Sequence, residues 1–122
     1  MAGMKFFGSA GAIGLFLGVA LGAFAAHTLR GHLSGEMLDV FETGVRYQMY
    51  HSMALLVVAI LSERGKWFKF GGFFYIAGII LFSGSLYALA LTGHSAWGMI
   101  TPAGGLSFMA GHVLIVWGFL KG

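Results

Sequence analysis

The sequence has no cysteine, one proline and very few charged residues. The absence of cysteine excludes disulfides, a thiolate nucleophile and a cysteine-ligated metal cluster. Only 9% of the 122 residues are Asp, Glu, Lys or Arg, whereas soluble domains carry about 25%. So few charged side chains do not cover a globular surface in water, and we therefore expect lipid to be the main solvent of this chain.

Several functional signatures are also absent. The net charge of +3 comes without a basic run or an RNA- or DNA-binding motif, so no nucleic-acid partner is predicted. The chain has no catalytic triad, phosphate-binding loop or HExxH motif. No carboxylate–histidine pair with ligand spacing accompanies the histidines near the chain's loops, His27, His32 and His94. We predict a protein without enzyme activity, with no catalytic residues, no metal site and no cofactor.

The chain does contain four long apolar stretches. A helix needs about 20 mostly apolar residues to cross the ~30 Å core of a bilayer, and residues 6–26, 44–62, 70–92 and 102–120 each come close to that length. None of them alternates with the period of two expected for a membrane β-barrel, and lipid does not tolerate open strands. The predicted fold is all-α: one domain over residues 1–122, an integral membrane four-helix bundle whose partner is the lipid bilayer.

The first stretch also resembles a signal peptide. Lys5 precedes the apolar run, and Ala23-Phe24-Ala25 matches an A-x-A cleavage site. The run is longer than the 7–15 apolar residues of a signal sequence. We therefore favour a retained transmembrane helix.

Residues 27–43 form the connection to the second stretch. Ser34 is a plausible helix N-cap, and Met37, Phe41, Val45 and Met49 then repeat every four residues. This spacing predicts a short amphipathic helix at the membrane interface, which either bends into the second span or runs directly into it.

Acidic and basic residues in this region are spaced for an ion pair. Glu42 precedes Arg46 by four residues, the favourable order for a pair on one helix face. Such a pair would lower the cost of holding Arg46 near the headgroups.

The distribution of Lys and Arg predicts an orientation. One side of the membrane would carry five of them (Lys5, Arg64, Lys66, Lys69, Lys121) and the other side two (Arg30, Arg46). Because cytoplasmic loops are rich in Lys and Arg, we predict a multi-pass protein with both termini in the cytoplasm.

Small residues recur every four positions in the first stretch. Gly14, Gly18 and Gly22 fall on one helix face, flanked by Ala10 and Ala26. Such a face lets another helix approach closely. Packing within the chain is the favoured interpretation, and a homo-oligomer through this glycine face is the alternative.

Polar side chains gather in the outer half of the predicted bundle. At 1.5 Å per residue, each of them lies between the outer boundary and about the middle of the membrane. Polar groups in a bilayer normally face the bundle interior, which predicts either an outward-facing polar pocket or a packed hydrogen-bond network without a ligand. The candidate residues are His27, Tyr47, Gln48, His51, Ser83, Ser85, Tyr87 and Thr101.

His51 is the most distinctive of these residues. Its imidazole needs a polar partner, and we expect Ser83, Ser85 or Tyr87 to supply a hydroxyl, because they lie at similar depth. A haem held by His51 and His112 is an alternative, since bis-histidine haem needs imidazoles from two helices at one depth.

Four stretches together resemble a known family. They are GAFAAH (22–27), TGVRYQMYH (43–51), LFSGSLYALAL (81–91) and TPAGGLSFMAG (101–111). The chain resembles domain-of-unknown-function family number 423, small four-span bacterial inner-membrane proteins whose eukaryotic relative is called transmembrane protein 256. The resemblance covers essentially the whole chain and implies a multi-pass protein of the bacterial plasma membrane whose function is not established.

The resemblance adds weight to particular positions. The family's pattern is matched at His27, Tyr47, Gln48, His51, Ser83, Ser85, Tyr87 and Pro102. At position 112 the family often carries Trp where this chain has His, which counts against a haem ligand there, and position 46 is variable. We predict a small binding or accessory protein with an outward-facing polar pocket. A small transporter or channel is the alternative, and a haem-binding membrane protein is less favoured.

Overall fold

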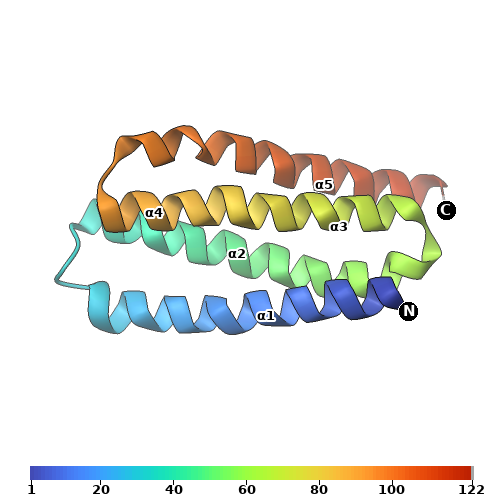
Figure 1. The fold of residues 1–122 in the computed structure, drawn as a ribbon, viewed down its shortest axis with the longest axis horizontal. Helices are drawn as coiled ribbons and strands as arrows, with labels where there is room; N and C mark the ends of the chain where they lie inside the picture. Colours follow the sequence, from blue (N-terminus) through green and yellow to red (C-terminus); the bar gives the residue numbers. More distant parts are fainter. Residues whose placement is uncertain (122) are drawn as a thin grey trace.

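The computed structural model describes residues 1–121, and they form four long helices that run up and down side by side (Figure 1). The first is α1 (Ala2–Phe24) continued by the π-helical turn η1 (Ala25–Leu29), and the second is α2 (Gly35–Leu61). After the 3-10 turn η2 (Ser62–Arg64), the third helix comprises α3 (Lys66–Gly78), the π-turn η3 (Ile79–Ser83) and α4 (Gly84–Thr92). The 3-10 turn η4 (Ser95–Met99) leads to α5 (Thr101–Lys121). The predicted all-α fold is confirmed.

Three of the four long helices are apolar enough to cross a membrane. Within the described residues, Ala2–Leu29, Lys66–Thr92 and Ser95–Lys121 qualify by length and composition. The second helix does not, because Arg46, Gln48 and His51 interrupt its apolar run.

The separate interfacial helix is not confirmed. Residues 35–43 form the first turns of α2, which continues without a break to Leu61, as in the alternative that the segment runs directly into the second span. Ser34 caps it as expected, its Oγ accepting a hydrogen bond from the Met37 backbone N–H at 3.1 Å. The predicted Glu42–Arg46 pair is absent from the ion pairs of residues 1–121; Arg46 Nη2 donates instead to Thr43 Oγ1 at 2.9 Å, one turn earlier on the same helix.

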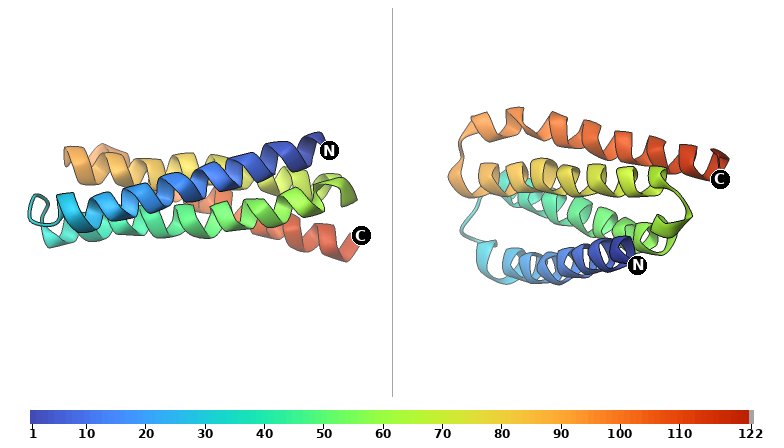
Figure 2. Two further views of the ribbon diagram at one scale, coloured as in Figure 1. Left: turned by 90° about the horizontal axis from the view of Figure 1, so that it is seen from below. Right: turned by 45° about the vertical axis from the view of Figure 1, so that its right-hand side comes forward.

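The helices are ordered α1, α2, third helix, α5. α2 packs between α1 and the third helix, whereas α5 packs on α3 and η3. Figures 1 and 2 show α1 and α5 at opposite edges of the bundle, with both chain ends at the same end. The side of α2 that faces α5 is therefore left mostly uncovered.

The glycine face of α1 packs against α2 within the chain. A Cβ added at Gly14 would lie 2.1 Å from Ser52 Oγ, and one added at Gly18 would lie 2.3 Å from Met49 Sδ. At Gly22 the nearest atom is Val45 Cγ1, at 3.5 Å. The favoured interpretation, packing within the chain, therefore fits; a homo-oligomer through this face would first have to displace α2.

A second close approach fixes α5. A Cβ added at Gly104 would lie 2.3 Å from the backbone nitrogen and 2.6 Å from the Cα of Phe82, inside the π-turn η3. No side-chain rotation relieves a clash with backbone. Only glycine therefore lets the start of α5 rest on η3 as it does.

This contact generates a matched pair of substitutions. Gly104→Ala should destabilise the bundle by about 1–3 kcal/mol, because an extra methyl group in a packed interface forces the backbones apart. Gly105→Ala should be neutral, since its Cβ would meet only Phe82 ring atoms at 3.8–3.9 Å. Thermal unfolding of both variants in detergent measures the difference, and equal stability of the two would show that α5 does not approach η3 so closely.

Candidate functional site between α2 and α5

Gln48 joins three helices through one side chain. It is buried, with 5% of its surface exposed. Its Nε2 donates to the backbone oxygen of Gly14 in α1 at 2.8 Å, and its Oε1 accepts from the Tyr87 hydroxyl of α4 at 2.7 Å. A Cβ at Gly14 would lie 2.1 Å from Ser52 Oγ, so glycine at this position allows the close approach of α1 and α2 across which the bond forms.

Serine hydroxyls tie the π-turn region to its neighbours. Ser83 Oγ donates to the Gly44 carbonyl of α2 at 2.6 Å. Ser85 Oγ donates to the Phe82 carbonyl at 2.9 Å and lies 2.6 Å from Thr101 Oγ1 at the start of α5. Because Ser85 has one hydrogen, Thr101 is the donor in that second bond.

These contacts favour a packed network over an outward-facing polar pocket. The amide and hydroxyl groups of Gln48, Ser83, Ser85, Tyr87 and Thr101 bond to one another or to backbone. No described cavity is lined by them together. The predicted pocket at this place is therefore not confirmed.

Two predicted residues lie outside this network. His27 is exposed in η1, and the structure gives its side chain no hydrogen bond within residues 1–121. The Tyr47 ring packs on Phe82, with 4.8 Å between ring centroids, and 38% of the residue is exposed. Tyr47 contributes its backbone carbonyl to the site described next.

A second set of polar groups, the histidine chain, connects α3, α5 and α2. It consists of the Tyr75 hydroxyl, the His112 and His51 imidazoles and the Tyr47 carbonyl. Tyr75 Oη lies 2.7 Å from His112 Nδ1, His112 Nε2 lies 3.2 Å from His51 Nε2, and His51 Nδ1 lies 2.8 Å from the Tyr47 carbonyl oxygen.

One arrangement of protons satisfies the whole histidine chain. A carbonyl only accepts, so His51 Nδ1 carries a hydrogen and, in the neutral ring, His51 Nε2 is an acceptor. His112 Nε2 must then donate to it, which leaves His112 Nδ1 to accept from Tyr75. In this arrangement each ring nitrogen makes one hydrogen bond, and both imidazoles are neutral.

The expected partners of His51 were wrong. The hydroxyls of Ser83, Ser85 and Tyr87 donate to other acceptors: the Gly44 carbonyl, the Phe82 carbonyl and Gln48 Oε1. His51 instead bonds to His112 of α5. Tyr75 was not among the predicted site residues, and His112 was considered only as a less favoured haem ligand. The available signal was a polar residue inside each of the last two apolar stretches: Tyr75 lies five residues after the start of the third stretch, and His112 lies eight residues before the end of the fourth. Because the two helices are antiparallel, these positions lie at neighbouring levels of the bundle.

The histidine chain does not fit a haem. His51 and His112 hydrogen-bond directly, and the Phe108 ring stacks on His51 with 3.5 Å between centroids. A planar macrocycle between the two imidazoles would require that stack and that hydrogen bond to separate. Across residues 1–121, no cluster of three or more His, Asp or Glu side chains could hold a metal ion.

A lateral groove runs beside the histidine chain where α2 and α5 do not pack together. Its part farther from the chain termini is a cavity of about 520 Å³, within the size range of small-molecule sites. A further cavity of about 250 Å³ continues it, and His112 lines both. The 520 Å³ cavity is lined by Tyr47, His51, Phe82, Pro102, Gly105, Leu106, Phe108, Met109 and His112.

Long apolar helices whose internal polar groups bond across the bundle are typical of an integral membrane protein. Residues 21–105 match the family described as "Protein of unknown function (DUF423)", and the chain belongs to this family. The matched residues include Gln48 and His51 and end before His112.

Named relatives agree with this class. The chain is 46% identical over 116 residues to the UPF0382 membrane protein YwdK of Bacillus subtilis, covering 93% of this chain and 94% of that protein. It is 41% identical over 112 residues to the UPF0382 inner membrane protein YgdD of Escherichia coli K12, covering 90% and 86%. No solved structure matches the chain. The chain is therefore a membrane protein of a family whose function is not established.

The Gln48–Tyr87 bond generates a double-substitution test. Gln48→Leu and Tyr87→Phe should each destabilise the bundle by about 1–3 kcal/mol, because each leaves a buried polar group unpaired. The double variant should cost less than the sum by about 0.6–1.7 kcal/mol. Denaturation in detergent measures the coupling, and strictly additive effects would contradict a direct bond.

Proposed function

We propose that the protein is a non-enzymatic binding protein that takes up an amphipathic, hydroxyl-bearing molecule from the bilayer through the lateral groove. One observation carries the proposal: His112 is exposed on the wall of the 520 Å³ cavity while it is hydrogen-bonded to buried His51. Placing an imidazole on an apolar, lipid-side wall costs free energy, and such residues within a membrane usually mark a functional site.

The chemistry of the histidine chain favours a hydroxyl group in the ligand. A hydroxyl both donates and accepts, so it can insert between the two Nε2 atoms, accepting from His112 and donating to His51. A carbonyl or ether would accept from His112 and leave the buried His51 nitrogen without a donor, which is unfavourable. The cavity walls, Phe82, Phe108 and Met109, suit an apolar tail.

The alternative is a small transporter or channel, and the histidine chain gives little support to it as a pathway for protons. The histidine chain ends at the Tyr47 carbonyl, which accepts a hydrogen bond but does not pass a proton on. The described helices also place no carboxylate beside it, since the four acidic residues are Glu36, Asp39, Glu42 and Glu63.

Binding can be tested with a photoactivatable long-chain alcohol and its methyl ether as the chemical control. We expect the alcohol to label peptides of α2 or α5 and the ether to label them more weakly. His112→Phe should reduce labelling by the alcohol about two- to tenfold, the equivalent of one hydrogen bond. His27→Phe is the matched control, because His27 lies outside the groove. Equal labelling by alcohol and ether, or no effect of His112→Phe, would contradict the proposal.

We further propose that all four long helices cross the membrane, with both termini in the cytoplasm. α1 ends and α3 begins at opposite ends of the bundle (Figure 1). If α1 and the third helix both cross, α2 must carry the chain back across. The five-to-two distribution of Lys and Arg supports the orientation.

Orientation is tested with Ser34→Cys and Lys66→Cys in intact cells. An impermeant thiol reagent should label position 34 and not position 66, and the native chain has no cysteine to confuse the result. Preferential labelling at position 66 would reverse the proposed orientation.

A further inference from the structure

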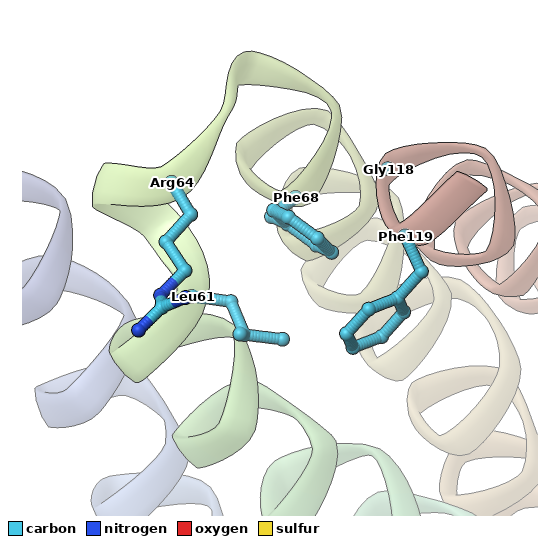
Figure 3. A pocket seen from close by; sticks show the side chains of 5 residues that line it. All are labelled: Leu61, Arg64, Phe68, Gly118 and Phe119. Carbon is cyan, nitrogen blue, oxygen red and sulfur yellow. The ribbon is translucent and has the colours of Figure 1, made fainter. Parts of the chain in front are cut away.

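Arg64 lies at the end of the bundle that holds both chain termini, on the wall of another cavity in the lateral groove. This cavity has a volume of about 360 Å³ and is lined by Leu61, Arg64, Phe68, Gly118 and Phe119. Figure 3 shows Arg64 and Leu61 on one side and the rings of Phe68 and Phe119 on the other. The Arg64 side chain extends back along the end of α2, alongside Leu61 (Figure 3).

The carboxylate nearest in sequence to Arg64 is already paired with other groups. Glu63 binds the N-terminal ammonium and lies 3.9 Å from Lys69 Nζ. The hydrogen bond from that ammonium lowers the pKa of Glu63, so the carboxylate is charged at neutral pH. Glu63 is the only acidic side chain in the sequence after Glu42. Within residues 1–121, no acidic side chain pairs with Arg64.

The cavity beside Arg64 continues toward the middle of the bundle. Leu61 lines both this cavity and the 250 Å³ cavity next to Tyr75 and His112. The lateral groove therefore offers a cationic group at one end and a series of apolar hollows beyond it. This combination matches a molecule with an anionic head and a hydrocarbon chain.

The surroundings of Arg64 suit the headgroup level of a bilayer. The ring centroids of Trp67 and Trp117 lie 6.4 Å apart at the same end. Lys66 Nζ lies 5.1 Å from the centroid of the Trp67 ring, and Lys121 Nζ lies 5.5 Å from that of the Trp117 ring. Trp and Lys of this kind anchor helices at the interface. A Lys or Arg close to an anionic phosphate attracts it by about 1 kcal/mol, and Arg64 is the basic residue that lines this cavity.

We propose that Arg64 binds the phosphate of an anionic phospholipid, one acyl chain of which lies in the groove between Leu61, Phe68 and Phe119. Arginine suits this role because its planar guanidinium offers paired donors to phosphate oxygens. The site is distinct from the histidine chain and does not depend on the binding function proposed above.

The test is competition between two lipids with identical acyl chains. Purified protein is incubated with equal amounts of phosphatidylglycerol and phosphatidylcholine, and native mass spectrometry measures the ratio retained. The wild type should prefer phosphatidylglycerol about fivefold or more. Arg64→Gln should bring the ratio close to one. Lys66→Gln is the matched control and should keep most of the preference, because Lys66 does not line the cavity.

Further measurements keep the outcome unambiguous. Arg64 is exposed, so Arg64→Gln should unfold at the wild-type temperature without added lipid, and Arg64→Lys should retain part of the preference. His112→Phe should leave the lipid ratio unchanged, which separates this site from the histidine chain. Each of three results would overturn the proposal. The first is an unaltered lipid ratio in Arg64→Gln, and the second is displacement of the lipid by inorganic phosphate. The third is a wild-type dimer that retains no lipid and that the Arg64→Gln substitution dissociates.

Discussion

Polar side chains removed from water must bond to one another, and this requirement organises the bundle around α2. Gln48 connects α2 to α1 and α4, and His51 connects it to α5. An unpaired group in either place would cost about 1–3 kcal/mol. Ser52 Oγ is the one buried side-chain polar atom without a partner among the described residues, and it occupies the space that a side chain at Gly14 would fill.

Glycine positions decide which helices meet and therefore where the groove opens. Gly14 and Gly18 bring α1 onto α2, and Gly104 brings α5 onto the π-turn η3. π-turns are frequent at functional sites, since they alter the alignment of side chains within a helix. With α5 seated on the third helix, the facing surface of α2 stays open, and the histidine chain bridges part of that gap.

Much of the fold could be predicted from sequence, because hydropathy and length alone indicate long helices. The glycine repeat of α1 could likewise be recognised from the local sequence pattern. Pairing between side chains was harder to predict. The direction in which His51 points depends on which helix lies opposite, and that follows from the close contact at Gly104. The pairing of Tyr75 with His112 depends on the same packing.

The central claim is that a single directional hydrogen-bond chain runs from Tyr75 through His112 and His51 to the Tyr47 carbonyl. Solid-state NMR of the ¹⁵N-histidine-labelled protein in lipid bilayers tests it directly, because the ring nitrogens report which of them carries a hydrogen. The account predicts neutral rings with opposite tautomers: hydrogen on Nδ1 of His51 and on Nε2 of His112. The same tautomer in both rings, or a charged imidazole in either position at neutral pH, would contradict it.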